Sequence, residues 1–307
     1  MSLFHKLKIG ILVTTREFLG THQLYRQVKT VRFEQRRNQL AEHILHDKER
    51  GVTDEKYFDH QVIVSLTTYG KRLYDVAFTI ESIMQQSVKA NKIVLWLEEG
   101  LRGKPLPQSL INQQRRGLEI DFCKDIRSYK KLIPSIQKYP NDAIITIDDD
   151  LLYEYDMVEQ LISEYREQPR YIHCCRKHKM LKSESYLKPY AKWTRADIGT
   201  GANRMNFFTG GAGTLYPPHS LDDEVLNEGV FMDICKFADD VWFNAMAIKK
   251  GTLVNKIYTR DPHGEGYLVN DDVQDIGLKK INLYGDNLND QQIKAVFTRY
   301  NIYELLK

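Results

Sequence analysis

Three consecutive carboxylates stand in the middle of the chain, directly after an apolar run. Residues 143–147 are apolar or β-branched, and Asp148, Asp149 and Asp150 follow at once. Such a run predicts a buried strand whose last residues emerge at the carboxyl edge of a sheet, where open α/β sheets bind ligands. Because alternate side chains of an extended segment point the same way, we expect Asp148 and Asp150 to share one divalent cation while Asp149 faces elsewhere.

The three aspartates also have a simpler interpretation. They could cap a helix that begins near Leu151, since the positive end of a helix favours acidic side chains. One aspartate is enough for that purpose, whereas three adjacent carboxylates repel one another unless a cation or hydrogen-bond donors offset them. A hard cation on one or two carboxylates usually takes its remaining oxygens from water and substrate phosphates. The pattern therefore favours a metal-bridged diphosphate over a cap.

A second polar run, Ser-Leu-Thr-Thr-Tyr-Gly-Lys-Arg at residues 65–72, ends another predicted strand. In a parallel sheet its turn would lie beside the aspartates, where hydroxyls, backbone N–H groups and a guanidinium could hold a nucleotide and its phosphates. We assign Thr67, Tyr69 and Arg72 to this site, with a solvated charge as the alternative for Arg72. Lys130 and Lys131 precede the aspartate strand, and one of them could contact a second phosphate, a role that we assign to Lys131, or both could simply be solvated.

The elements that would position these residues alternate between strands and helices. Strands are predicted at residues 61–68, 93–97, 118–122 and 143–147, and helices at 75–86, 110–116, 132–139 and 156–166. Alternation of this kind predicts an α/β fold with a mostly parallel sheet covered on both faces. Further strands are expected at 171–175 and 253–258 and helices at 239–249 and 289–306. Between them, residues 176–195 are basic and aromatic without a period.

Together these features resemble the nucleotide-sugar glycosyltransferases of the GT-A fold, with bacterial family-2-like and exostosin-like enzymes the nearest groups. The resemblance covers roughly residues 62–267. It implies a nucleotide-sugar donor, usually a UDP-sugar, and Mn²⁺ or Mg²⁺ as cofactor. Asp148 would touch the ribose or the metal, Asp149 would lie in the nucleotide site, and Asp150 would bind the metal directly. His263 would complete the metal ligands, as a late histidine does in some members, or it could be a plain loop residue.

The resemblance extends to the glycines and to a second acidic pair. Gly210 and Gly211, in a run of three glycines, would let the backbone floor the site between donor and acceptor, whereas a plain tight turn is the alternative. Asp239 and Asp240 resemble the acidic pair that opens a helix near the acceptor in inverting members. Deprotonating an acceptor hydroxyl calls for a general base, so we assign that role to Asp240, with Asp239 as the alternative and a helix cap as the simpler reading.

The predicted function is therefore metal-dependent transfer of a sugar to an acceptor hydroxyl in cell-surface glycan synthesis, by a hexosyltransferase-type enzyme. Direct displacement would invert the anomeric centre, and we favour inversion, although the exostosin-like resemblance points to retention. Trp193 could stack on an acceptor sugar or lie in the core. Magnesium-dependent phosphoryl transfer is an alternative, but the sequence lacks a Gly-x-x-x-x-Gly-Lys-Ser/Thr loop. A non-catalytic module that binds sugar nucleotides or membranes is the third possibility.

Composition narrows these choices. The 307 residues are 42% hydrophobic and 28% charged, which is ordinary for a soluble globular protein, and a net charge of +3 is too small to indicate nucleic-acid binding. The four cysteines show no Cys-x-x-Cys spacing, which favours a reducing compartment over a disulfide framework or a zinc site. No run approaches the ~18 apolar residues of a membrane span. These features predict a cytoplasmic protein.

The amino-terminal part differs in character from the rest. Residues 1–60 read as a basic amphipathic helical extension followed by a charged linker, and residues 61–307 as the GT-A-like domain. Such a helix could lie on anionic lipid through residues 1–45, at the inner face of the membrane, where a lipid-linked glycan acceptor would be found. Alternatively, its apolar side could pack on its own domain or on a second subunit.

Overall fold

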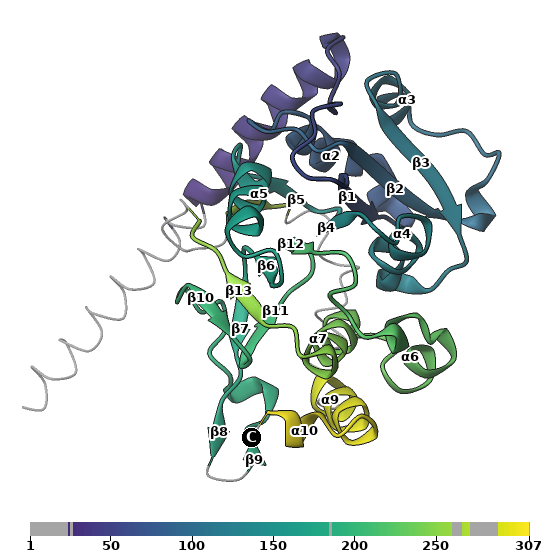
Figure 1. Cartoon of the computed structure of the whole chain (residues 1–307). Coiled ribbons are helices and arrows are strands. Elements are labelled where there is room, and N and C mark those ends of the chain that lie inside the picture. Colours follow the sequence, from purple (N-terminus) through teal and green to yellow (C-terminus); the bar gives the residue numbers. More distant parts are fainter. Residues whose placement is uncertain (1–23, 25–26, 184–185, 260–265, 271–287, 307) are drawn as a thin grey trace, which may run out of the picture.

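The computed structural model describes residues 24, 27–183, 186–259, 266–270 and 288–306, and within these it shows the α/β fold expected from the sequence (Figure 1). Its centre is an eight-stranded sheet of the described residues with the order β10-β13-β6-β12-β4-β1-β2-β3. All neighbouring strands run parallel except β12 and β10, which are antiparallel to their partners. The strands are β1 (Val62–Thr67), β2 (Lys92–Glu98), β3 (Leu118–Cys123), β4 (Ala143–Ile147), β6 (Ile172–Cys174), β10 (Gly201–Asn203), β12 (Ala212–Tyr216) and β13 (Val254–Lys256).

Helices cover both faces of this sheet, because the side chains of each central strand alternate between two apolar cores. In β1, Val62 and Val64 belong to one core and Ile63 to the other. The first core is closed by α2 (Val76–Met84), α3 (Gln108–Gln114) and α5 (Met157–Glu167). The second is closed by α4 (Ile133–Lys138), α6 (Glu228–Ile234), α7 (Asp239–Lys250), α9 (Leu288–Arg299) and α10 (Ile302–Leu305). Burial on both faces explains why β1, β2 and β4 are mostly apolar.

Short two-stranded ladders extend the sheet at its carboxyl edge. They pair β5 (Leu151–Tyr153) with β14 (Tyr267–Val269), β7 (Lys177–Lys179) with β11 (Asn206–Phe208), and β8 (Lys182–Ser183) with β9 (Tyr186–Leu187). The 3₁₀ helices used below are η1 (Gly70–Tyr74), η2 (Glu99–Leu101), η3 (Arg127–Lys131), η4 (Tyr190–Lys192) and η5 (Asp223–Leu226). The simpler reading of the three aspartates, a helix beginning near Leu151, is wrong, since that residue starts β5 and the next helix begins at Met157.

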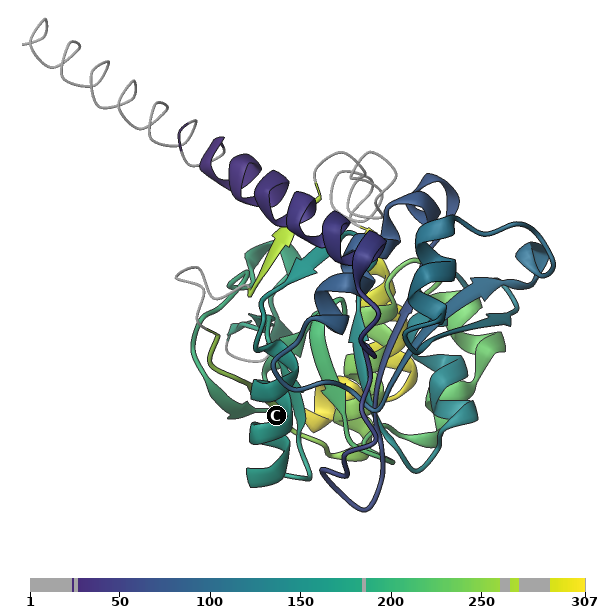
Figure 2. The same ribbon diagram turned by 90° about the horizontal axis from the view of Figure 1, so that it is seen from above.

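A long helix precedes the domain, and its described part comprises residues 24 and 27–46. Phe33, Leu40 and Ile44 are buried against the domain, whereas Leu24 and Val28 are exposed. Figure 2 shows the corresponding arrangement, with the later turns lying over the body and the first turns extending beyond it. The carboxyl half of the helix therefore packs on its own domain, one of the two outcomes expected for an amphipathic segment. No described helix is long and apolar enough to span a membrane. Lipid contact by residues 1–45 stays a prediction, and residues 1–23 lie outside the described part.

Candidate functional site

Acidic side chains from two distant segments gather where β4 ends and α7 begins. The three aspartates after Ile147 arrive from the middle of the sheet, and the acidic pair of the first turn of α7 arrives from the helix beside it. Two buried cations, one in η1 and one at the end of η3, lie among them. We call these seven residues the acidic cluster: Asp148, Asp149, Asp150, Asp239, Asp240, Arg72 and Lys131.

Arg72 holds the last two aspartates of the triplet. Its Nη1 lies 2.7 Å from Asp149 Oδ1 and its Nη2 lies 3.1 Å from Asp150 Oδ2. Thr68 Oγ1 donates to the other oxygen of Asp149 at 2.6 Å. Burial raises the pKa of Asp149, and the guanidinium of Arg72 opposes that rise. The predicted alternation, with Asp148 and Asp150 on one side, is not observed, because β4 ends at Ile147 and Asp149 and Asp150 lie in a turn.

Lys131 joins the triplet to helix α7. Its Nζ lies 2.9 Å from Asp148 Oδ1 and 3.1 Å from Asp239 Oδ2. Although burial lowers it, the carboxylates of Asp148 and Asp239 raise the pKa of Lys131 well above its usual range, so the ammonium group is charged. The side chain of Asp148 is 43% exposed, in contrast to the buried Lys131. A charged ammonium group thus lies beside the accessible carboxylate of the cluster.

Gly210 and Gly211 form the turn between β11 and β12 and lie between the two acidic segments. The N–H of Gly210 donates to Asp240 Oδ1 at 2.8 Å, and Asp148 N donates to the carbonyl oxygen of Gly211 at 3.0 Å. A Cβ atom on Gly211 would lie 1.7 Å from Asp148 Oδ2, so a larger residue would displace that carboxylate. The glycines are therefore more than a plain turn, because they allow both carboxylates to approach the backbone.

The two acids of α7 differ in their surroundings. Asp239 is buried, and its oxygens face Ser128 Oγ at 2.8 Å and Lys131 Nζ at 3.1 Å. Asp240 is partly exposed and accepts the hydrogen bond from Gly210. Burial of its carboxyl group and the charge of Asp239 raise the pKa of Asp240 to about 7, against the opposing charge of Lys131. A carboxyl group that titrates near neutral pH can accept a proton there, so Asp240 suits a general base better than Asp239 does.

Some predicted site residues lie elsewhere. The hydroxyl of Thr67 donates to the Trp96 carbonyl oxygen at 2.8 Å within the sheet, and its neighbour Thr68 contacts the cluster instead. Tyr69 is exposed beside the cluster, with its ring centre 5.6 Å from Arg72 Cζ. Trp193 is buried in a core, as the simpler interpretation had it. His263 lies outside the described residues.

Sequence reasoning missed two residues that hold the cluster together. Ser128, at the start of η3, fixes one oxygen of Asp239. The hydroxyl of Tyr153 donates to the Gly211 carbonyl oxygen and accepts from the N–H of Asp148 at 2.9 Å. Neither residue belongs to a motif, although a tyrosine three positions after the aspartate triplet was a usable hint that a buried hydroxyl would need polar partners.

The cluster fits a divalent cation only in part. Among the described residues, no three His, Cys, Asp or Glu side chains are gathered so that they alone could hold a metal ion. The cluster nevertheless contains five carboxyl groups against two cations, and Asp148 is accessible. An Mg²⁺ or Mn²⁺ ion often binds through one or two carboxylates and completes its shell with phosphate oxygens and water. The donor set therefore fits a cation that arrives with a diphosphate.

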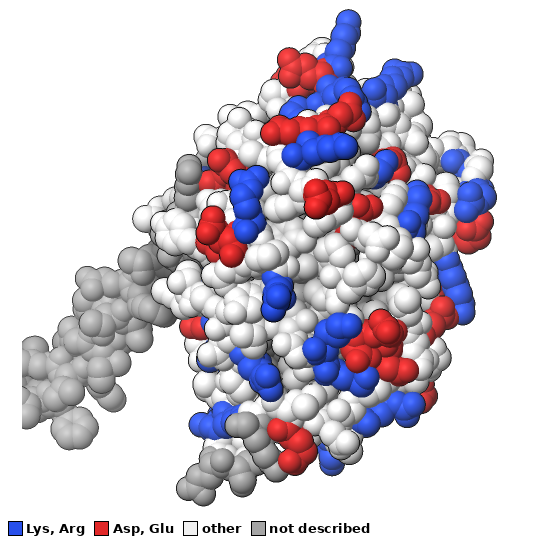
Figure 3. Space-filling view, in the orientation of Figure 1, with Lys and Arg blue, Asp and Glu red and all other residues white. Residues whose placement is uncertain are grey.

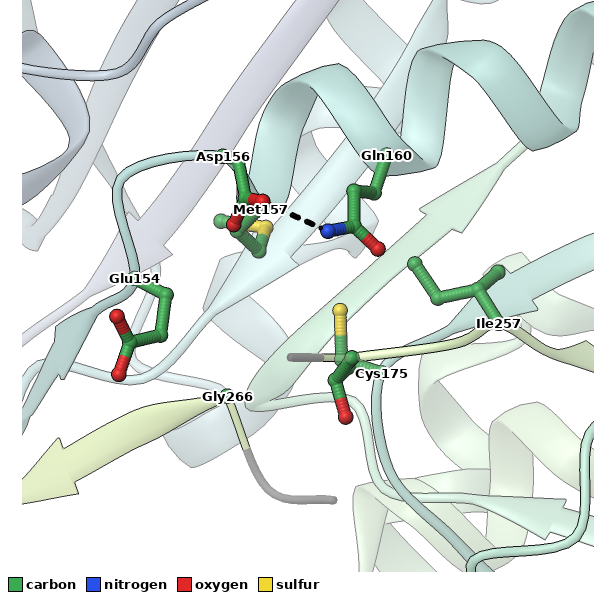
Figure 4. Close-up of a pocket in the computed structure, with 8 residues that line it drawn as sticks. Glu154, Asp156, Met157, Gln160, Cys175, Ile257 and Gly266 are labelled. Atoms are coloured by element: carbon green, nitrogen blue, oxygen red, sulfur yellow. Dashed lines mark hydrogen bonds between the residues drawn. The ribbon is translucent and has the colours of Figure 1, made fainter. Parts of the chain in front are cut away.

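Two hollows of the described surface lie away from the acidic cluster. The first, shown in Figure 4, is lined by Glu154, Met157, Cys175 and others, and its volume of about 10 Å³ has room for no more than one water. The second is a broad depression of about 760 Å³ at the opposite edge of the sheet, lined by residues of the stretch 50–61 together with Asn91, Lys92 and Glu119. Neither contains a predicted site residue.

Comparisons with known proteins add a likeness of fold. No family model matches the chain, and a search of curated proteins found no match. Among solved structures, the inositol-1-phosphate CTP transferase from T. maritima aligns with a TM-score of 0.39 and 11% identity, over 65% of this chain and 86% of that one. The structure of S. aureus TarS 1-349 in complex with UDP aligns with a TM-score of 0.41 and 11% identity, over 64% of this chain and 57% of that one. These are partial structural similarities, and they indicate nothing about the activity of this chain.

Proposed function

We propose that the protein is a glycosyltransferase that moves a sugar from a nucleotide diphosphate sugar, with UDP as the expected nucleotide, to the hydroxyl group of an acceptor. One observation carries this proposal. A partly exposed carboxyl group with a pKa of about 7, Asp240, lies across the glycine pair from Asp148, the accessible carboxylate of a cluster that carries excess negative charge. The first can act as a base, and the second can recruit a cation with its diphosphate.

Each side of this arrangement has a task in displacement at the anomeric carbon. Asp240 accepts the proton of the acceptor hydroxyl as that oxygen attacks, while the Gly210 N–H holds the carboxylate in place. Lys131, charged and buried at 2.9 Å from Asp148, lies where it can offset the charge of the departing diphosphate. A divalent cation bound with the donor would neutralise part of that charge as well. Attack from the face opposite the leaving group inverts the anomeric centre.

Arg72 takes a different role from the predicted one. Since its guanidinium already binds Asp149 and Asp150, we assign it to positioning the aspartate turn and leave phosphate contact to Lys131. Of the two predicted metal ligands among the described residues, Asp148 is accessible, whereas the side chain of Asp150 is only 11% exposed. In this proposal Asp148 is therefore the first candidate for contact with the cation.

Calorimetric titration with UDP, with and without Mn²⁺, tests the proposal. We expect UDP to bind wild type when Mn²⁺ is present and to lose most of that affinity in Asp148→Asn. Asp121→Asn is the matched control, because Asp121 also lies at the carboxyl end of a parallel strand but is paired with Lys138. The proposal is contradicted if UDP fails to bind under any condition, or if hydrolysis of phosphoesters without a sugar acceptor exceeds turnover of every UDP-sugar supplied.

A further inference from the structure

A buried hydroxyl group without a hydrogen-bond partner lies beside the candidate base. Among the described residues, the Tyr216 hydroxyl oxygen is buried and neither donates nor accepts a hydrogen bond. A Cβ atom on Gly210 would lie 3.3 Å from this oxygen and 3.2 Å from Asp240 Oδ1. Both oxygens thus border the small space that Gly210 leaves free because it has no side chain. A buried hydroxyl without a partner is costly and uncommon, so this one calls for a functional explanation.

The ring of Tyr216 is held where its hydroxyl group meets this space. Tyr216 is the last residue of β12 and lies opposite Ile144 of β4, and both belong to the core that α7 closes. Its ring makes edge-on contacts with Phe208 and Phe243, with ring centres 5.4 and 6.4 Å away. Phe243 is three residues after Asp240 on α7, so the ring packs on the helix turn that carries the base. A phenylalanine would fill the same core, and the hydroxyl group therefore needs a reason other than packing.

Thr146 is the alternative partner for this hydroxyl group. Its Oγ1 borders the same space, 3.5 Å from the Cβ position of Gly210. Because the Thr146 hydroxyl donates to the Gly210 carbonyl oxygen at 2.5 Å, it can only accept a hydrogen bond from Tyr216. An ionised carboxylate is the stronger acceptor, since hydrogen bonds to charged groups are about twice as strong as those between neutral groups. Once Asp240 is ionised, the Tyr216 hydroxyl is therefore expected to donate to Asp240 rather than to Thr146.

Tyr216 keeps its proton at neutral pH and can therefore act as a hydrogen-bond donor. Burial, and after it the charge of Asp240, raises the pKa of Tyr216 well above its usual range. The phenol is thus neutral at the pH where Asp240 titrates, about 7. A neutral phenol beside a carboxylate stabilises the ionised form of that carboxylate when it donates to it.

Nearby groups, rather than the outer surface, are expected to set the titration of Asp240. On the face seen in Figure 3 the acidic and basic side chains of the described residues are interspersed, and exposed charges are screened by salt more than buried ones are. The charged groups that act on Asp240 are Asp239 on the same helix, Lys131 of η3 and Asp148 after β4. Burial raises the pKa of three further groups that feel the charge of Asp240, so they keep their protons: Tyr129, Tyr190 and Cys235.

Resting on the proposed function, in which Asp240 is the base, we infer that Tyr216 is a positioning residue for that base. When Asp240 is ionised, the Tyr216 hydroxyl donates to Oδ1 beside the N–H of Gly210, and Oδ2 is left to take the proton of the acceptor hydroxyl. Two donors on one oxygen fix the rotation of the carboxylate and favour its ionised form. The missing side chain of Gly210 provides the space in which the hydroxyl group and the carboxylate meet.

An NMR titration of the Asp240 carboxyl carbon tests this inference without any substrate. The full chain is labelled with ¹³C at the aspartate carboxyl groups, and the Asp240 signal is assigned by its loss in Asp240→Asn. Wild type, Tyr216→Phe and Tyr165→Phe are compared, and the thermal transition of each is recorded below and above the pKa of Asp240. Tyr165 is the matched control, because it is a buried tyrosine of the other core whose hydroxyl oxygen lies 3.0 Å from His60 Nε2.

We expect the Asp240 midpoint to move to higher pH by on the order of one unit in Tyr216→Phe and to stay in place in Tyr165→Phe, because a carboxylate that loses a donor binds its proton more tightly. With a UDP-sugar that is turned over, kcat/KM of Tyr216→Phe should fall about tenfold below the wild-type midpoint and approach the wild-type value well above it. The thermal transition of Tyr216→Phe should match that of wild type below the midpoint and lie lower above it, since only the ionised carboxylate uses the donor.

The inference is overturned if the Asp240 midpoint in Tyr216→Phe equals that of wild type, or if Tyr165→Phe moves the midpoint as far. It is also overturned if the thermal transition of Tyr216→Phe falls by the same amount on both sides of the midpoint, because a hydroxyl group that serves packing alone would have that effect. A midpoint that moves as expected in a protein that turns over no UDP-sugar supports the contact between Tyr216 and Asp240 and contradicts the proposed function instead.

Discussion

The acidic cluster differs in its treatment of charge from the basic segment of residues 176–206, which has eight lysines and arginines against two acids. The cluster holds most of its charges in ion pairs, with the buried Arg72 and Lys131 each binding two carboxylates. The basic segment leaves several cations at the surface, among them Lys192 and Arg195. Buried pairs fix geometry, whereas exposed charges attract mobile partners and give little stability of their own. If the proposed function holds, the difference corresponds to a rigid donor side and an adaptable acceptor side.

Asp240 is the candidate base, so its removal should have the largest effect on the rate of sugar transfer. We expect Asp240→Asn to lower the rate of sugar transfer by about 10²- to 10⁴-fold, the usual contribution of a general base. UDP affinity in the presence of Mn²⁺ should stay unchanged, because the proposed function assigns Asp240 to the acceptor. Asp222→Asn serves as the control. Asp222 caps η5 and pairs with Lys249, which lies in the last turn of α7, far from Asp240. Turnover of the Asn variant at the wild-type rate would exclude Asp240 as the base.

Rigidity of the donor side is tested next by Arg72→Met. Removing the guanidinium leaves Asp149 and Asp150 buried without their cation, so the free energy of unfolding should fall by about 3–5 kcal/mol. Urea denaturation measures this loss. Arg116→Met breaks a comparable buried pair with Glu81 far from the cluster and should cost similar stability. Only the Arg72 variant should also lose UDP affinity at temperatures where both variants are folded, and equal UDP affinity in the two would separate Arg72 from the site.

The sequence predicted the elements on which the acidic cluster depends. Strands β1, β2, β3 and β4 and helices α2, α5 and α7 lie where the sequence placed them, since each contributes apolar residues to one of the two cores. The sequence also predicted that the turn with Arg72 would lie beside the aspartates, because adjacent parallel strands end at the same edge of a sheet. Strand β12 was not predicted, since it is short, carries Gly213 at φ 94° and has an irregular register against β4.

The contacts between the site residues were harder to predict than the residues themselves. The sequence nominated Lys131 as a phosphate contact but gave no sign that it joins Asp148 to Asp239, residues that are 91 positions apart in the chain. Nor did strand alternation show that Asp149 and Asp150 would share one arginine, because the chain leaves the sheet at Ile147. Such contacts depend on turns and on long-range packing, which local patterns do not record. The basic character of residues 176–195 was visible, but the pairing of β7 with β11, the strand that leads into Gly210, was not.

A smaller change tests whether Gly210 and Gly211 set the position of the Asp148 carboxylate relative to Asp240. Gly211→Ala places a Cβ atom 1.7 Å from Asp148 Oδ2, so the exposed carboxylate must rotate away and lose its contact with Lys131. We expect UDP affinity in the presence of Mn²⁺ to fall about tenfold, equivalent to ~1.4 kcal/mol. In Gly100→Ala the nearest atom to the new Cβ is 3.9 Å away, so that control should bind UDP like wild type. Wild-type affinity in Gly211→Ala would show that Asp148 does not contact the donor complex.

The smallest predicted effect is a displacement of the pH profile. A base must be deprotonated to act, so kcat/KM should rise with pH through the pKa of Asp240, about 7. Burial and the negative charge of Asp239 raise that pKa, and Asp239→Asn removes the second of these causes. The rise in activity should therefore move to lower pH, on the order of one pH unit. Because Asp239 also binds Lys131, the variant is compared with Ser128→Ala, which removes the other partner of Asp239 but keeps its charge. A profile that moves equally in both variants would assign the shift to a change in the position of α7, and a profile that moves to higher pH would contradict the electrostatic coupling of the two acids.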